Sequence, residues 1–408
     1  MTRPRSAFRF FPLYNYVVGL GIFAAGSLIA SENRTNWVTS AYAKNVGAVV
    51  SIQGDKVDEF GGSSRSSSDS NKSYNGMGTG IILDERGYIV TNYHVVQGIR
   101  RIQVTTHDKT RYIGTLEERD EETDLAIIKI TPKQPLQTMT LGFSDDIMPG
   151  EFCMAIGNPY GYAFKATHGL VSGVGEEVAV NDDLLYRNAI QTSTPINPGN
   201  SGGPLINVDG EMIGINAAIR QGAECIAFAI PVDQVVDVAA RLIGKITERT
   251  VSHGINVYQT DSGSDVAQRA GVSQESTRRS IVVVESVDAN SPGAAAGLKP
   301  GDVITGIGPF SVENKLDFHR AMLECTAGDD LGFAVLRELE TFDIPLALAS
   351  PRSRGLVARG GASRSNSSLT PGPGRVTPGP KIGNQARLAE DAVWETLGLK
   401  YAPMPKAE

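Results

Sequence analysis

Between residues 78 and 230 the chain is a series of short apolar runs separated by turns of Gly, Asp and Asn. Examples of these runs are Tyr88–Thr91, Leu125–Ile130 and Phe152–Ile156. Runs of this length, rich in β-branched residues and bounded by turn residues, are typical of β-strands. Sustained helical periodicity is scarce in this region. The sequence therefore predicts a mainly β unit built as a sandwich or a barrel.

A helix is predicted where the β-rich region ends. Over residues 231–246 apolar side chains recur at intervals of three and four, which places them on one face of a helix. The residues of this face are Val232, Val235, Val236, Ala239, Leu242 and Ile243. We expect the helix to close a first folded domain over residues 36–248.

A second, smaller domain is predicted over residues 251–349. Strand-like segments lie at Ile255–Tyr258, Ile281–Val287 and Leu331–Leu336, and a helical segment lies at Lys315–Glu324. This mixture fits a small α+β module. Two folded domains also agree with the length of 408 residues, because domains commonly contain roughly 150 residues.

Composition excludes several classes of protein. Hydrophobic residues make up 41% of the chain, which is inconsistent with global disorder, and the net charge of −7 does not favour a nucleic-acid partner. Cys153, Cys225 and Cys325 lie far apart without a C-x-x-C pair. They suggest neither a zinc site nor a disulfide framework, and we expect buried thiols and no cofactor.

The two ends of the chain differ from the folded domains. Three arginines precede the apolar stretch Phe10–Ala30, so residues 1–35 are predicted to be a signal peptide or a membrane anchor. Either alternative carries the following domains across a membrane. Residues 350–384, rich in Gly, Pro, Ser and Arg, predict a disordered linker. Residues 385–408, which include Trp394, predict a short helical segment.

Three segments together carry the residue types needed for acyl transfer to a serine. Ser201 lies in the glycine-rich turn Asn197–Pro204, His94 follows one predicted strand, and Asp124 precedes another. A serine nucleophile needs a base to take its proton and a carboxylate to orient that base. Each segment alone is weak evidence, but their occurrence in one β-rich domain predicts a catalytic triad.

The first domain resembles the protease domain of the HtrA/DegP family of chymotrypsin-fold serine proteases, and the second resembles the family's PDZ domain. Besides the three triad segments, the motifs that carry the resemblance are Gly78–Ile82, Ala155–Gly161, Gly169–Ser172, Ile190–Thr192, Ile196–Leu205 and, in the PDZ domain, Ser291–Ile304.

This resemblance implies a mainly β protein with two six-stranded β-barrels and the triad in their cleft. It implies an oxyanion hole formed by the amides of Gly199 and Ser201, with no metal or other cofactor. The expected activity is endoproteolysis of unfolded or misfolded exported proteins, with C-terminal peptides as PDZ ligands. Homo-oligomers, trimers or their multiples, are also implied. The expected location is the periplasm, or the inner membrane with the protease domain outside the cytoplasm.

The chain departs from the family pattern at three places. Ser193 stands where the family commonly has Asp. Around the primary specificity pocket, for which we expect Pro195, Ile226 and Ala227, alanine and cysteine replace two glycines and indicate a narrower pocket. In the loop expected to bind peptide carboxylates, His253-Gly254-Ile255, a histidine replaces an apolar residue.

Two classes of function follow from these observations. The first is a serine endopeptidase with a PDZ module for substrate binding or regulation. The alternative is a non-proteolytic holdase or scaffold that keeps the barrels and binds unfolded chains. The intact His94, Asp124 and Ser201 favour the endopeptidase.

Overall fold

The computed structural model describes residues 35–54, 76–158, 164–179, 184–219, 225–272 and 280–351. The predictions for residues 1–34 and for the C-terminal segment after residue 351 lie outside these ranges. Among the helices of the described ranges, none has the length and apolar character needed to cross a bilayer.

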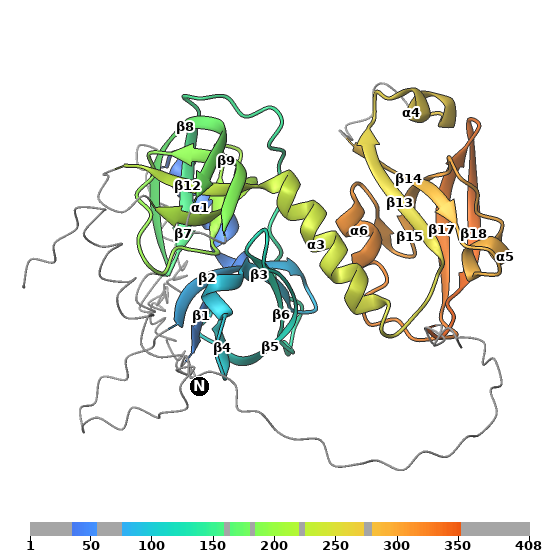
Figure 1. The fold of residues 1–408 in the computed structure, drawn as a ribbon, viewed down its shortest axis with the longest axis horizontal. Helices are drawn as coiled ribbons and strands as arrows, with labels where there is room; N and C mark the ends of the chain where they lie inside the picture. Colours follow the sequence, from blue (N-terminus) through green and yellow to red (C-terminus); the bar gives the residue numbers. More distant parts are fainter. Residues whose placement is uncertain are drawn as a thin grey trace, which may run out of the picture. The chain divides into compact units, whose positions relative to one another are not determined.

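The first six strands form a closed barrel with the order β1-β2-β3-β6-β5-β4 (Figure 1). Neighbouring strands are antiparallel, and pairing of β1 with β4 closes the ring. Apolar residues from five of the strands, including Val50, Ile82 and Ile128, fill the interior. The bounds are β1 Val49–Gly54, β2 Gly76–Asp84, β3 Tyr88–Asn92, β4 Ile102–Thr105, β5 Arg111–Asp120 and β6 Leu125–Lys129.

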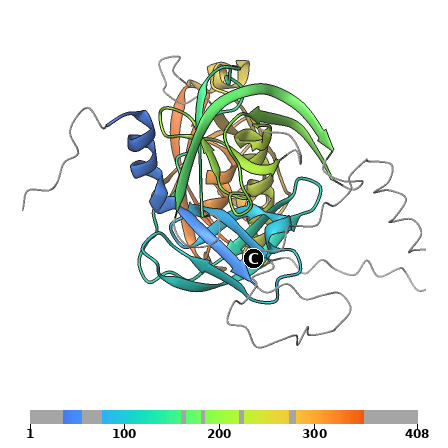
Figure 2. The same cartoon turned by 90° about the vertical axis from the view of Figure 1, so that its left-hand side faces the viewer.

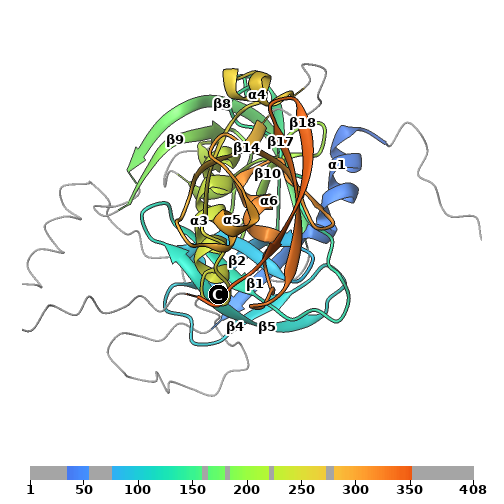
Figure 3. The same cartoon turned by 90° about the vertical axis from the view of Figure 1, so that its right-hand side faces the viewer.

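The next six strands form a second closed barrel with the order β10-β11-β12-β9-β8-β7. Pairing of β10 with β7 closes it, and Cys153, Ile190 and Leu205 are among the buried residues of its core. The long, curved strand β8 is visible in Figure 3. The bounds are β7 Phe152–Gly157, β8 Lys165–Ala179, β9 Leu185–Thr192, β10 Pro204–Ile206, β11 Met212–Ile219 and β12 Ala227–Pro231.

Helices precede and follow these strands. Helix α1 (Trp37–Asn45), drawn in blue in Figure 2, starts at a capping box in which the Asn36 and Thr39 side chains each accept a bond from the other's backbone N–H. A 3₁₀ turn, η2 (Val46–Ala48), leads into β1. Helix α3 (Val232–Thr247) follows β12. All six residues predicted for its apolar face are buried, so that prediction is confirmed.

Residues 252–349 contain a six-stranded sheet with the order β13-β14-β15-β17-β18, and β16 pairs with β15. Figure 3 shows β17 beside β18, which its register confirms. Three short helices accompany the sheet, and Phe318 and Phe333 are fully buried in the core. The bounds are β13 Ile255–Asp261, α4 Asp265–Ala270, β14 Ser280–Val287, α5 Pro292–Ala296, β15 Val303–Ile307, β16 Phe310–Ser311, α6 Lys315–Arg320, β17 Asp330–Arg337 and β18 Glu340–Ala347.

The predicted fold class is confirmed: a mainly β protein with two six-stranded barrels and a small α+β domain. The alternative of a sandwich is excluded for the first domain because both sheets close. Two details differ from expectation. Helix α6 ends at Arg320, four residues before the predicted end, and turns follow it. Cys225 is exposed and Cys325 is half-buried, whereas Cys153 is buried as expected.

Candidate active site

His94 and Asp124 meet at one end of the first barrel. Strand β3 ends at Asn92, and His94 lies in the helical turn α2 (Tyr93–Val96) directly after it. Asp124 precedes β6 and has a φ of 55°, a left-handed conformation that aspartate adopts more readily than most residues. Its carbonyl accepts the Tyr93 N–H at 2.9 Å, which fixes the turn against α2.

The side chains of His94 and Asp124, both expected in the triad, are in direct contact. The distance between His94 Nδ1 and Asp124 Oδ2 is 2.6 Å, and Asp124 Oδ1 accepts the His94 backbone N–H at 2.8 Å. The Asp124 side chain is only 3% exposed, while the His94 side chain is 42% exposed. A buried carboxylate therefore holds an imidazole that is partly accessible to solvent.

The turn that carries Ser201 packs against the same end of the first barrel. Gly202 has a φ of 81°, and a Cβ there would lie 2.2 Å from both the Thr79 carbonyl oxygen and Thr91 Oγ1. Only glycine fits this place, because it tolerates both the conformation and the close approach. Since Thr91 is three residues before His94, the contact brings the serine turn and the histidine turn together.

Thr79 of the first barrel fastens this turn by two hydrogen bonds. Its N–H donates to the Ser201 carbonyl at 2.9 Å, and its hydroxyl donates to the Gly199 carbonyl at 2.6 Å. Thr79 is fully buried, so water does not compete for these bonds. The carbonyl groups on both sides of Asn200 are thus fixed from outside the turn.

The amides of the turn fall into two groups. Asn200 N–H donates to the Asn197 carbonyl at 2.9 Å, and Gly202 N–H donates to the Asn216 carbonyl at 2.8 Å. The N–H groups of Gly199 and Ser201 have no acceptor in the part of the chain that the structure describes. These two are the donors expected for an oxyanion hole. The Ser201 hydroxyl is 3.5 Å from the Ala217 carbonyl oxygen.

Tyr186 belongs to this site, although the sequence gives no signal for it. It lies near the start of β9 and is 5% exposed, and its hydroxyl donates to Asp124 Oδ2 at 2.7 Å. Burial, together with the neighbouring carboxylate, raises the pKa of Tyr186 far above its ordinary value of 10.0. The phenol therefore stays a donor.

The residues expected around the specificity pocket differ in exposure. Pro195 is exposed, and its carbonyl accepts the Thr167 hydroxyl at 2.7 Å. Ile226 is half-buried, and Ala227 is buried opposite Thr192. Ser193 replaces the usual Asp, and its hydroxyl accepts the Leu170 N–H at 3.0 Å.

The loop expected to bind peptide carboxylates contains a buried histidine. His253 is 8% exposed, its ring packs edge-on against Phe318, and its Nδ1 accepts the Ile255 N–H at 3.1 Å. Gly254 has a φ of 66°, and a Cβ there would lie 2.2 Å from Ser291. The His253 ring thus packs where the family has an apolar side chain, and it accepts a hydrogen bond from one amide of its own loop.

Metal binding finds no support in the described residues, where no group of three or more His, Cys, Asp or Glu side chains is arranged to hold an ion. The hydroxyl, imidazole, carboxylate and backbone amides described above are the groups that acyl transfer to a serine requires.

Comparisons with known proteins agree with this arrangement. Residues 78–215 match the trypsin-like peptidase domain family, and residues 268–348 match the PDZ domain family. The putative serine protease HhoB of Synechocystis sp. is 36% identical over 270 residues, covering 64% of either chain. The chain belongs to the HtrA/DegP type of serine protease.

Other members show the same range of similarity. The probable periplasmic serine protease do/HhoA-like of Haemophilus influenzae is 32% identical over 308 residues, or 74% of this chain and 63% of that protein. Protease Do-like 1, chloroplastic, of Arabidopsis thaliana is 35% identical over 280 residues, which cover 64% of this chain and 61% of that protein. This HtrA-type chain thus spans less than two thirds of the length of each of these relatives.

Among solved structures, the HtrA-type protease AlgW with tripeptide aligns at a TM-score of 0.45. The two sequences are 30% identical, and the alignment covers 77% of this chain and 97% of that one.

Proposed function

We propose that the protein is a serine endopeptidase in which Ser201 is the nucleophile, His94 the general base and Asp124 the group that orients it. The observation that carries this proposal is the His94–Asp124 pair, 2.6 Å apart, beside a serine turn with two unbonded amides. In the proposed reaction Ser201 Oγ attacks a peptide carbonyl carbon while His94 takes the hydroxyl proton.

The same groups complete the proposed reaction. The carbonyl oxygen becomes an oxyanion that accepts hydrogen bonds from the amides of Gly199 and Ser201. His94 then returns its proton to the leaving amine, which leaves an acyl group on Ser201. Attack by water, with His94 again as base, releases the new carboxyl terminus and restores the serine.

Unfolded or misfolded exported proteins are the proposed substrates. The relative from Haemophilus influenzae is named a periplasmic protease, which supports export of this chain. The proposed location is the periplasm, or the inner membrane with the protease domain outside the cytoplasm. The N-terminal segment of residues 1–35 would be the signal peptide or anchor, and N-terminal sequencing of the exported protein separates the two.

The test of activity uses unfolded casein with the wild type and the Ser201→Ala variant. Wild type should fragment casein, and the variant should lose about a million-fold in turnover, with an unchanged thermal unfolding midpoint. Equal cleavage by both proteins would contradict the assignment. Protection of casein from aggregation without any cleavage by the wild type would instead establish the holdase alternative.

The second domain, residues 251–349, is proposed to bind C-terminal peptides by adding them as a strand beside β13. The carboxylate would meet the amides of His253, Gly254 and Ile255. Because the Ile255 N–H already donates to His253 Nδ1, capture should be weak. Binding of a labelled peptide with an apolar C-terminal residue, measured by fluorescence anisotropy against its C-terminal amide, tests this mode. Equal affinity for the two peptides would reject it.

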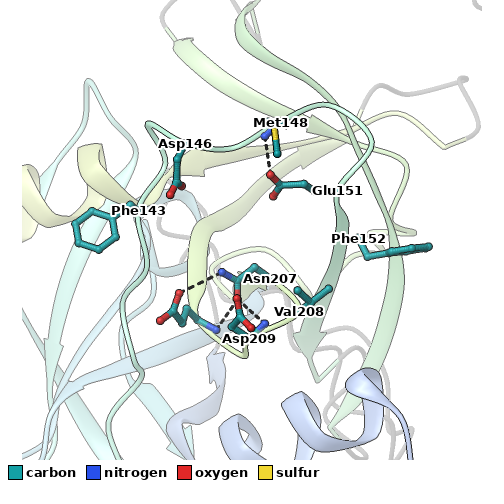
Figure 4. Close-up of a pocket in the computed structure, with 9 residues that line it drawn as sticks. Phe143, Asp146, Met148, Glu151, Phe152, Asn207, Val208 and Asp209 are labelled. Atoms are coloured by element: carbon teal, nitrogen blue, oxygen red, sulfur yellow. Dashed lines mark hydrogen bonds between the residues drawn. The ribbon is translucent and has the colours of Figure 1, made fainter. Parts of the chain in front are cut away.

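Self-association is proposed through an exposed apolar patch on the second barrel. Met148, Phe152 and Val208 are 64%, 53% and 44% exposed and line one pocket, which Figure 4 shows. The ring centroid of Trp37 in α1 lies 5.9 Å from that of Phe152, and Leu170 pairs with Phe152 across the strands.

Exposed apolar clusters of this kind commonly mark protein interfaces, and a second copy of the chain is the proposed occupant. Phe152→Glu should lower the mass measured by sedimentation equilibrium to that of a monomer. If the variant kept the mass of the wild-type oligomer, the interface would lie elsewhere. If the wild type were itself a monomer, the proposal of self-association would be rejected.

A further inference from the structure

Tyr186 connects the second barrel to the buried acid of the first. It lies on β9, where it pairs with Val178 of β8, and its hydroxyl oxygen is 2.7 Å from Asp124 Oδ2. The two residues are 62 positions apart in the chain. The bond therefore joins elements that only the packed barrels bring together.

Tyr186 supplies one of the three hydrogen bonds that the Asp124 carboxylate accepts. Oδ1 accepts the His94 backbone N–H, and Oδ2 accepts both the His94 ring N–H and the Tyr186 hydroxyl. At 3% exposure the side chain has little access to water that could replace a missing donor. Loss of a hydrogen bond to a buried charge is costly, so removal of the Tyr186 hydroxyl would leave Asp124 less firmly held in the rotamer that contacts His94.

Strand β9 also leads to the nucleophile. It ends at Thr192, whose hydroxyl donates to the Leu170 carbonyl and which pairs with Ala227 of β12. The loop with Ser201 follows at once. Strand β9 is paired with a neighbouring strand on each side. It contacts Asp124 near its start, and its end leads into the loop that carries Ser201.

We propose that Tyr186 is a positioning residue of the triad, which holds Asp124 from the second barrel so that His94 faces the Ser201 loop. This inference rests on the proposed triad. Tyr186 touches no reacting atom; it acts through Asp124, which fixes the tautomer of His94.

The test replaces Tyr186 by Phe, which removes the hydroxyl and keeps the buried ring. Tyr88→Phe is the matched control, because Tyr88 is also 5% exposed but lies on β3 and is not placed at the site. Cleavage of a short chromogenic peptide should show kcat lower by about tenfold to a hundredfold in Tyr186→Phe, with KM unchanged. The control should keep the wild-type kcat.

A second pair of variants shows whether the effect passes through Asp124. In an Asp124→Ala background, Tyr186→Phe should cause no further loss of kcat, because the side chain that accepts the Tyr186 hydroxyl is already absent. A full additional loss there, or a wild-type kcat in the single variant, would overturn the inference. Failure of the triad itself is recognised separately, by undiminished cleavage in Ser201→Ala.

Discussion

Two histidines of the second domain, of which His253 is buried and His319 is half-buried, should make the stability of that domain depend on pH. The rings of His253 and His319 both pack edge-on against Phe318, with 5.5 Å and 5.1 Å between ring centroids. Burial lowers the pKa of each histidine from 6.5 to about 4. Asp288 opposes the shift at His253, whereas His253 and Lys315 add to the shift at His319.

The sign of the effect follows from proton binding. At about pH 7.5, one unit above the ordinary histidine pKa of 6.5, both histidines are almost entirely neutral in the folded and the unfolded chain, so their burial costs no stability. As the pH falls below about 7.5, the histidines of the unfolded chain become protonated. In the folded domain the same histidines stay neutral until the pH approaches their lowered pKa of about 4. Between about pH 7.5 and about pH 5, each histidine should lower the free energy of unfolding by about 2 kcal/mol, and the pair by about 4 kcal/mol.

Hydrogen exchange of the β14 amides in the full chain measures this change locally, after correction for the intrinsic exchange rate at each pH. The control is the double variant His253→Asn, His319→Gln, in which neither side chain titrates and the introduced asparagine can still accept the Ile255 N–H. Other ionisable groups contribute equally to both proteins, so the difference isolates the histidines. An equal pH dependence in wild type and variant would refute the reasoning.

Three further predictions concern the site and the second domain. Gly202→Ala should lower kcat/KM on a chromogenic peptide by roughly a hundredfold by displacing Ser201, while Gly150→Ala, with a φ of 100° but open space around it, should not. Removing residues 251–408 should change the rate on unfolded casein more than the rate on a short peptide, because only a long chain can bridge both domains; equal fractional changes would leave the second domain a passive appendage. Mass-spectrometric mapping of casein fragments should show cuts after small or medium aliphatic residues, since Pro195 offers no acid to a substrate cation; a majority of cuts after Lys or Arg would contradict this.

The sequence predicts the elements whose signal is local. The apolar face of α3 and the strands around His94 and Asp124 each follow from a pattern within a few residues, and the structure contains them. The predicted end of α6 is wrong because apolar residues continue beyond Arg320 into a buried turn. In that region the Met322 and Leu323 amides donate to carbonyls three residues back instead of four, so the hydrophobic spacing of a helix continues into turns.

The contribution of Tyr186 could not be predicted, because a tyrosine near the start of an apolar strand has the pattern of an ordinary core residue. Its partner, Asp124, belongs to the other barrel, and only the packing of the two barrels places the hydroxyl on the carboxylate. Similarly, His253 departs from the apolar residue expected in its loop, but the structure accommodates it by burial against Phe318 and a bond from Ile255.

Covalent labelling by a fluorophosphonate tests the central claim most directly, because only a serine activated by a neighbouring base reacts rapidly with it. Peptide mapping of the labelled full chain should find the phosphonyl group on Ser201 alone. Ser201→Ala should remain unlabelled, and Asp124→Asn should react far more slowly. A wild-type protein that remains unlabelled, or that is labelled equally after Ser201→Ala, would contradict the assignment of the triad.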